Sequence, residues 1–325
     1  MAVNDRTGKG KLLRNVVSLP LYRGQIKHFD PSWPSISRNF SRNKSLVSDL
    51  TPEDRASLFK RLVLNRWFAT ELQKHPMMQW ANSEGIEVDL IAIAQHYGIP
   101  TAYFDLSESF AIAAFFATCR MVGDTGHWEP MAEGSGVIYC IQAMAGDPRI
   151  SAICHQPFPR PSFQWAWIAE LRLGESLLQA PSLQSIHFEH DQRVGEALLE
   201  KFDGGLKLFP PDPSARLASE MCKTSDLPVI HVDEVEAWLA NDPKGLSLEE
   251  VKIVRRDLQK QGVRFVTASQ VAYSQQDLFL AEKEWSQMNG DFYQDVSVRY
   301  ALPVGSDGAN ASAIPSNTSA IPQVP

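Results

Sequence analysis

The sequence predicts an α+β fold in which a small mixed or antiparallel sheet is flanked by helices. Short runs of β-branched and aromatic residues, typical of strands, are scattered among helical patterns and lack the strand–helix alternation of a parallel α/β sheet. From Pro210 onward the apolar residues recur mainly at helical spacing. We therefore expect a helical extension after the sheet.

The chain divides into four expected segments. Residues 1–18 are polar and basic with no sustained period, which predicts a flexible lead-in. Residues 19–208 should form the α+β domain, and residues 209–302 the mainly helical extension. Residues 303–325 contain the tetrapeptide Ser-Ala-Ile-Pro twice amid Asn, Ser and Pro, and they are too poor in core-forming residues to fold. They predict a disordered tail.

The composition favours a globular, cytoplasmic protein. Of its 325 residues 44% are hydrophobic, which is enough to fill a sizeable core. The net charge of −7 argues against a surface built mainly to neutralise nucleic-acid phosphates. The four cysteines are widely spaced without a Cys-x-x-Cys pair, so neither a disulfide framework nor a zinc site is indicated. No run reaches the ~20 apolar residues of a membrane span, and we expect no membrane partner.

The N-terminal part should begin with a short strand, a long loop and a helix. Leu21 to Gly24 reads as a strand closed by a turn glycine, with Tyr22 and Arg23 on opposite faces. Residues 25–50, rich in Pro, Ser and Asn, predict an irregular loop. A threonine cap followed by proline and two acidic residues then predicts a helix to about residue 74.

The central stretch should pass from a helix through a sharp turn into a strand. Apolar residues on one face predict a helix over 87–97, with His96 at its edge and Gln95 pointing away. Gly98 is placed to adopt the left-handed conformation that ends a helix, and Pro100 prevents its resumption.

The remaining elements follow from the same rules. Ser107 is expected to cap a helix that is apolar all round and therefore buried. A capping box with Ser247 and Glu250 begins a later helix that Gly262 ends. The predicted strands cover 102–105, 137–141, 165–171 and 185–191, and the predicted helices cover 108–121, 194–202, 248–261 and 269–288.

Several motifs resemble those of the FRG-domain family. One is Tyr22-Arg23-Gly24-Gln25, an aromatic residue followed by Arg-Gly. A longer one, Gln95-His96-Tyr97-Gly98-Ile99-Pro100-Thr101, is similar to the family's Gln-His-Tyr-Gly-aliphatic-Pro-Thr signature, and it is followed by Asp105-x-Ser107 and a helix of small and aromatic residues. A further match is Arg160-x-x-x-Gln164-x-Ala166. The resemblance covers roughly residues 19–170.

This resemblance implies a bacterial or phage-associated domain similar to ADP-ribosyltransferases and met in conflict or toxin-like settings. It implies an ADP-ribosyltransferase-like fold, NAD or another nucleotide as the ligand, and a protein or nucleic acid as a possible target. One departure is visible, because the family commonly has Arg-Leu-Leu-Asp-Trp after Pro-Thr, whereas this chain has Ala102 to Leu106 without the arginine. An anion contact from that position is therefore in doubt.

An NAD-consuming transferase needs a cation for the diphosphate, an aromatic wall for nicotinamide and a polar or acidic group near the ribose, where positive charge develops. On the resemblance, Arg23 beside Gly24 supplies the cation, and Tyr22 and Tyr97 supply the aromatic walls. Each residue also has a structural alternative. Arg23 could pair with a surface carboxylate or stabilise the turn at Gly24, and Tyr97 fits the buried face of its helix.

The candidate catalytic residues are His96, Asp105 and Gln164. His96 is placed to face a cleft as donor or general base, and Asp105 could orient it, although an aspartate just before a helix is often only a turn residue. Gln164 should share a strand face with Ala166 and Glu170. The Gln/Glu-x-Glu pattern of many ADP-ribosyltransferases is absent, since alanine stands two residues after Gln164. A binding role is thereby favoured.

Two other function classes remain as alternatives. The same cleft could belong to a non-catalytic module that holds a nucleotide, a peptide or a partner protein. A nuclease-like hypothesis depends only on His187 to Asp191, where a histidine and two acidic residues would share a strand face. No third element with metal-ligand spacing accompanies this cluster, so we expect no metal.

Overall fold

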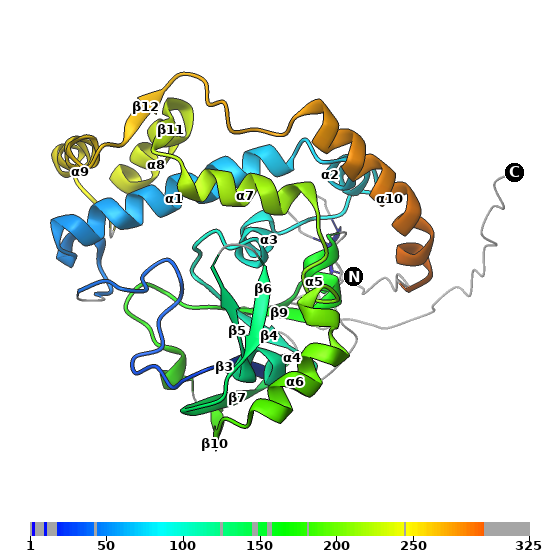
Figure 1. The fold of residues 1–325 in the computed structure, drawn as a ribbon. Coiled ribbons are helices and arrows are strands. Elements are labelled where there is room, and N and C mark those ends of the chain that lie inside the picture. Colours follow the sequence, from blue (N-terminus) through cyan, green and yellow to red (C-terminus); the bar gives the residue numbers. More distant parts are fainter. Residues whose placement is uncertain are drawn as a thin grey trace, which may run out of the picture.

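A computed structural model describes residues 2–3, 10–11, 18–41, 44–123, 126–144, 149–154, 158–180, 182–243 and 245–295. The α+β fold is confirmed: a layer of helices lies over an antiparallel sheet (Figure 1). The expected lead-in over 1–18 is described only at Ala2–Val3 (β1) and Gly10–Lys11 (β2), which pair with each other, and at Ser18. The expected tail over 303–325 lies outside the described residues.

Within the described residues, six strands form the main sheet, and every neighbouring pair is antiparallel. In spatial order they are β10 (Gln184–Glu189), β7 (Ser135–Met144), β3 (Ser18–Gln25), β4 (Tyr103–Ser107), β9 (Ala166–Glu170) and β8 (Ile150–Ala152). The strand predicted around Arg23 is therefore central in the sheet. Its neighbour β7 pairs with it along its whole length, with Arg23 opposite Tyr139.

The two faces of the sheet pack against different parts of the chain. One face carries Leu21, Phe104 and Tyr139 in an apolar cluster that is completed by Leu177 from the segment after β9. The other face is covered by α4 (Phe110–Thr118) and α3 (Leu90–His96). Tyr22 and Gly24 belong to this second face, as strand alternation predicts.

Helix α4 approaches β3 unusually closely because Gly24 has no side chain. A Cβ atom on Gly24 would lie 1.7 Å from the carbonyl oxygen of Ala113 and 2.7 Å from the amide nitrogen of Ala117. Small residues on the helix and glycine on the strand thus allow backbone-to-backbone contact. This contact sets how closely α4 lies on β3.

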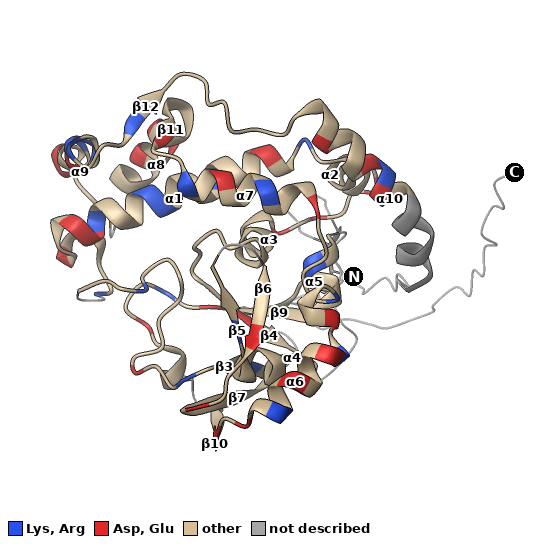
Figure 2. Ribbon diagram, in the orientation of Figure 1, with Lys and Arg blue, Asp and Glu red and all other residues tan. Residues whose placement is uncertain are grey.

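One apolar core is shared by helices that precede most of the sheet strands in sequence and helices that follow them. Buried residues of α1, such as Phe59 and Trp67, pack with Leu217, Val232 and Val254. The helices involved are α1 (Pro52–Leu72), α2 (Pro76–Ser83), α7 (Pro213–Lys223), α8 (Val229–Asn241), α9 (Leu248–Lys260) and α10 (Gln275–Asp295). Lys and Arg alternate with Asp and Glu over this layer (Figure 2).

Shorter elements complete the fold. A hairpin of β5 (Cys119–Val122) and β6 (His127–Pro130) follows α4 directly, and α6 (Gln192–Lys201) packs against it. The one-turn helix α5 (Pro159–Phe163) precedes β9. A parallel pair joins β11 (Asp226–Pro228) to β12 (Arg264–Val266), and single 3-10 turns occur at Val47–Asp49, Leu177–Gln179 and Asp203–Gly205.

Three predicted helix starts were wrong, each for a local reason. Helix α3 begins at Leu90 because Asp89 caps it, accepting from the amide of Ala92 at 2.9 Å. Helix α4 is capped by Ser109, because Ser107 is the last residue of β4. Helix α10 begins at Gln275 after Ser274 and Asp277 form reciprocal cap contacts.

Other helix and strand boundaries depend on pairing between segments of the chain. The helix expected to reach residue 121 ends at Thr118, because Cys119–Val122 leaves it to pair with β6. Helix α2 was not predicted, although His75 and Pro76 form its cap and first turn. The strand and helix predicted over 185–202, and the capping box of Ser247 and Glu250, are confirmed. None of the helices in the described ranges combines the length and apolar character that a membrane crossing requires.

Gly24 and Gly98 allow a matched test of the close approach. Gly24→Ala should cost at least about 3 kcal/mol of unfolding free energy, since the backbone atoms in its way cannot rotate aside. Gly98→Ala should cost only about 1–2 kcal/mol, because Gly98 needs φ of +83° but has open space around its Cβ position. Urea unfolding of both variants measures the difference, and equal costs would contradict this account.

His75 should make stability fall on acidification. It is buried beside Phe158, and burial lowers the pKa of its imidazole from 6.5 to about 4. Between these values the unfolded chain binds the proton more readily, so the free energy of unfolding decreases as the pH falls from about 6.5 to 4, by up to roughly 3 kcal/mol. In His75→Asn an amide oxygen that cannot titrate replaces Nδ1 of His75 as the acceptor for the amide of Met77, and urea unfolding should show a shallower pH dependence. Identical slopes in both proteins would refute the assignment.

Candidate functional site

A cleft of about 600 Å³ opens where β3 and β4 separate. In the described structure these two strands share the single pair Tyr22–Ser107, after which they diverge. The floor comes from β3 and β4, one wall from the loop over 26–39, and the other from α4 and the β5–β6 hairpin. The side chains used below are Tyr22, Arg23, Phe29, Trp33, Arg38, Asp105, Ser107, Phe116, Trp128 and Gln164.

Arg23 bridges the gap between the diverging strands. Its Nη1 donates to the backbone carbonyl oxygen of Asp105 at 2.9 Å, and its guanidinium lies 4.4 Å from the ring centre of Phe104. Its buried Nε has no hydrogen-bond partner within the described part of the chain. Burial lowers the pKa of Arg23 to about 10, Asp105 opposes this shift, and Arg38 adds to it. The cleft therefore contains a poorly compensated cation.

Asp105 presents a carboxylate that is both held and accessible. Its Oδ2 accepts from Nε2 of Gln95 at 3.2 Å, and its side chain is 37% exposed. Its Oδ1 lies 3.6 Å from Nε2 of His96, and neither atom has a hydrogen-bond partner among the described residues. A proton on that nitrogen would convert the contact into an ion pair.

Two hydroxyl groups hold the amide oxygen of Gln95. The hydroxyl of Thr101 donates to its Oε1, and the hydroxyl of Ser35 lies 3.2 Å from the same oxygen. The amide nitrogen is thereby directed at Asp105. Gln95, which was predicted to point away from the apolar face of its helix, thus turns its amide toward the carboxylate of Asp105.

Gln164 fixes the tautomer of His96. Its Nε2 donates to the carbonyl oxygen of Leu208 at 2.9 Å, and a carbonyl can only accept. Its Oε1 must then be the atom that lies 2.9 Å from Nδ1 of His96, so this ring nitrogen carries hydrogen. In the neutral ring, Nε2 is consequently the bare nitrogen that faces Asp105.

The same glutamine joins three segments of the chain. Its backbone carbonyl accepts from the hydroxyl of Ser107 at 2.8 Å, which ties the end of α5 to β4. Arg160, one turn earlier, donates to the carbonyl oxygen of His96 at 3.3 Å. The motif Arg160-x-x-x-Gln164 thus holds both the backbone and the ring of His96.

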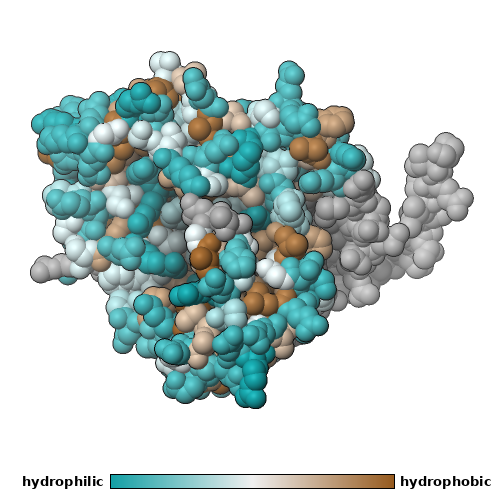
Figure 3. Space-filling model, in the orientation of Figure 1, coloured by the Kyte–Doolittle hydropathy of each residue, from teal (hydrophilic) through white to brown (hydrophobic). Residues whose placement is uncertain are grey.

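Aromatic side chains form the walls of the cleft. Tyr22 contacts Phe110 edge to face, with ring centres 5.4 Å apart. Trp128 of the hairpin stacks on Phe209 at 5.3 Å and lies 5.9 Å from Phe116. On the face shown in Figure 3, hydrophobic residues gather near the middle and hydrophilic residues surround them.

The structure brings most of the predicted site residues together. Tyr22, Arg23, Gly24, Asp105 and Gln164 all line the cleft. His96 is absent from this lining, because its side chain is 1% exposed and lies behind Asp105.

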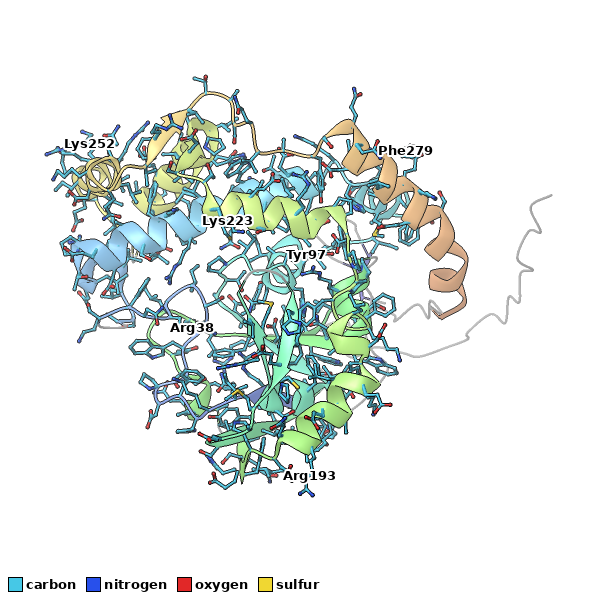
Figure 4. All side chains as sticks on the ribbon, viewed as in Figure 1. Arg38, Tyr97, Arg193, Lys223, Lys252 and Phe279 are labelled. Carbon is cyan, nitrogen blue, oxygen red and sulfur yellow. The ribbon has the colours of Figure 1, made fainter. Side chains whose placement is uncertain are left out.

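Tyr97 does not form the expected aromatic wall. It is buried in the core of the helical layer, 5.8 Å from Phe68 and 4.7 Å from the guanidinium of Arg160 (Figure 4). Burial, together with Asp212, raises the pKa of Tyr97 well above its usual value. Its position directly after α3 places this side chain in the helical layer and not in the cleft.

Gln164 reaches the site by a different route from the one predicted. It follows α5 and precedes β9, so it does not share a strand face with Ala166 and Glu170. The strand begins only after Trp165, whose φ of +48° is incompatible with extended strand backbone. Glu170 pairs with Tyr103 at the far end of β4 and lies outside the cleft.

Two residues of the cluster over 187–191 make structural contacts. Nε2 of His190 lies 2.9 Å from the carbonyl oxygen of Ile26, and Asp191 caps α6 and pairs with Arg193 (Figure 4). In the ranges that the structure describes, no group of three or more His, Cys, Asp or Glu residues is arranged to hold a metal ion.

The prediction missed Gln95, Trp33, Arg38 and Trp128. Gln95 could have been found, because it is the first residue of the Gln-His-Tyr-Gly signature. The others stand on an irregular loop or on an unpredicted hairpin, where no periodic pattern indicates the direction of a side chain.

Residues 19–125 match the FRG domain. This part of the chain contains β3, α1, α3, β4 and α4, and therefore the floor of the cleft. No curated protein matches the chain, and no solved structure does. The chain thus carries an FRG domain in its N-terminal part.

The hydrogen-bond network predicts the tautomer of His96. Long-range ¹H–¹⁵N NMR correlations should show hydrogen on Nδ1 of the neutral ring. In Gln164→Leu the acceptor of this hydrogen is lost, and the neutral ring should shift toward the Nε2–H form, which can donate to Asp105. The variant should also lose about 1–3 kcal/mol of stability, because the carbonyl of Leu208 is left unpaired. An Nε2–H tautomer in the unaltered protein would contradict the assignment.

Proposed function

We propose that the protein is an NAD-consuming transferase of the ADP-ribosyltransferase-like type and that the cleft between β3 and β4 binds NAD. The observation that carries this proposal is the presence of Arg23 and Asp105 on the floor of one cleft of about 600 Å³. A volume in this range is typical of small-molecule sites. The FRG domain and the motif resemblance give the reason for choosing NAD.

Arg23 is suited to the diphosphate. Its Nε is buried without a partner in the described structure, and its charge is only partly offset by Asp105. A diphosphate oxygen would supply the missing acceptor and the missing negative charge, and charge-assisted hydrogen bonds of this kind are strong.

The aromatic walls are suited to the two ring systems of NAD. Tyr22 stands beside Arg23 on the floor, and Phe116 and Trp128 stand on the hairpin side. Aromatic side chains that are already packed lose little conformational freedom when a flat ring stacks on them. We assign the nicotinamide ring to the Tyr22 side, because Tyr22 pairs with Ser107, two residues after Asp105 on β4, and all three line the cleft.

The reaction would break the bond between nicotinamide and C1′ of its ribose. The electron pair of that bond passes to the nicotinamide nitrogen, and positive charge develops on the ribose. A nucleophile of the target, a protein or a nucleic acid, forms the new bond to C1′ and gives its proton to a base. Asp105 is the carboxylate placed to stabilise the charge or accept the proton.

The other polar residues act through Asp105. Gln95 holds Oδ2, and His96 faces Oδ1 from behind. Gln164 in turn holds the ring of His96. His96 and Gln164 are thus positioning residues in this proposal.

NAD at ten times its Kd should stabilise the protein by roughly 1.4 kcal/mol, which corresponds to a rise in Tm of about 2 °C for a chain of 325 residues. Arg23→Ala should abolish the rise, because the diphosphate loses its cation. Far-UV circular dichroism of the variant without NAD checks that it folds. No rise at millimolar NAD in the unaltered protein would count against the proposal.

A non-catalytic binding module is the second candidate. It is favoured by the fact that Asp105 is the only carboxylate among the described residues that line the cleft. Release of nicotinamide, or a mass increase of a target, would support the transferase. Asp105→Asn keeps the size of the side chain and should retain the NAD-induced rise in Tm while losing turnover. Saturable binding without turnover in the unaltered protein would support the module.

A further inference from the structure

The cleft holds a second arginine that the proposed reaction does not use. Arg38 lies on the loop wall, across from the sheet floor, and its side chain is exposed (Figure 4). Within the described residues, its guanidinium has no carboxylate partner. Arg120, by contrast, also lines the cleft but pairs with Glu129 at 3.5 Å. Arg38 is therefore a free cation at the mouth of a ligand-sized cleft.

The loop that carries Arg38 is held in place from behind. Nη1 of Arg61 donates to the backbone carbonyl oxygens of Ser35, Ile36 and Arg38, at 3.1, 2.6 and 3.2 Å. The amide of Ile36 also donates to the carbonyl of Thr101 at 2.9 Å, next to the residues that orient Gln95. The backbone of Arg38 is thus fixed relative to the floor before any ligand arrives.

Positive charge accumulates around this point. Burial lowers the pKa values of Arg23 and Arg61, and Arg38 lowers both further, so the guanidinium of Arg38 repels each of the other two. Two carboxylates oppose this repulsion, Asp105 beside Arg23 and Asp54 beside Arg61. Asp54 is already engaged by the amide and hydroxyl of Ser41, at 3.1 and 2.8 Å on Oδ2. One more anion at the cleft would relieve the repulsion.

We propose that Arg38 and Arg23 form a two-sided subsite for the diphosphate of the ligand, with Arg23 below and Arg38 on the loop side. The identity of the ligand rests on the proposed function, whereas the anion subsite rests on the two side chains. A diphosphate carries a negative charge on each phosphate, and planar guanidinium groups match phosphate oxygens in pairs. The cleft should therefore select dinucleotides and nucleoside diphosphates over nucleosides.

The selection can be tested with three probes: ADP-ribose, ADP and adenosine. In Arg38→Ala, the affinity for ADP-ribose and for ADP, measured by isothermal titration calorimetry, should fall at least tenfold, while the affinity for adenosine stays unchanged. The affinities of Arg38→Lys for ADP-ribose and ADP should lie between those of the unaltered protein and those of Arg38→Ala, because lysine keeps the charge but loses the paired donors. Arg256→Ala removes the same charge from the distant α9 and should leave all three affinities unchanged.

The outcomes separate this inference from the proposed reaction. If ADP binds in an Arg38-dependent way but no nicotinamide is released from NAD, the subsite stands and the transferase proposal fails. If nicotinamide is released and Arg38→Ala binds ADP as tightly as the unaltered protein, the subsite is overturned and the reaction stands. An equal loss of affinity for adenosine and ADP would also overturn it, since it would indicate a general disturbance of the cleft.

Discussion

The fold depends on how the sheet is held together where β3 and β4 part. A buried carbonyl must find a donor, and the next donor along a regular ladder would have been a backbone amide of β3. The carbonyl of Asp105 instead accepts from the side chain of Arg23. This hydrogen bond from a side chain links β3 to β4 across the gap that opens into the cleft. It also buries a cation with an unpaired Nε, which is costly until an anion arrives.

Each residue of the Tyr-Arg-Gly motif has a separate physical task. Tyr22 makes the last strand pair with Ser107, Arg23 spans the gap, and Gly24 lets α4 contact the backbone of β3. The three tasks are adjacent because the strand alternates faces, so the residue facing the apolar side is flanked by two that face the helix. Three consecutive residues of the eight-residue strand β3 therefore carry all three tasks.

Sequence reasoning located the floor of the cleft but not its walls. Arg23, Asp105 and Gln164 were predicted because motifs of fixed spacing contain them, and the structure brings them to one cleft. For Tyr97 the wall position implied by the resemblance was wrong, whereas the core position predicted from the apolar face of its helix is confirmed. The hairpin after α4 and the loop arginine Arg38 were missed, because their positions depend on packing between segments far apart in sequence. Gly98 and the Ser247 cap were predictable, because a single local conformation requires them.

The helical layer and the cleft are mechanically connected through Arg160. Its guanidinium stacks on Tyr97, lies 3.6 Å from Asp212 at the start of α7, and donates to the carbonyl of His96. Burial raises the pKa of Asp212, and Arg160 opposes this rise. The two charges therefore depend on each other, and neither can be removed without leaving a buried ion unpaired. On its other side, His96 faces Asp105. A shift of α7 that moved Asp212 would therefore be passed to the carboxylate of Asp105 through Arg160 and His96. The core shared by α1 and α7 resists such a shift, so the helical layer serves as the rigid support of the site.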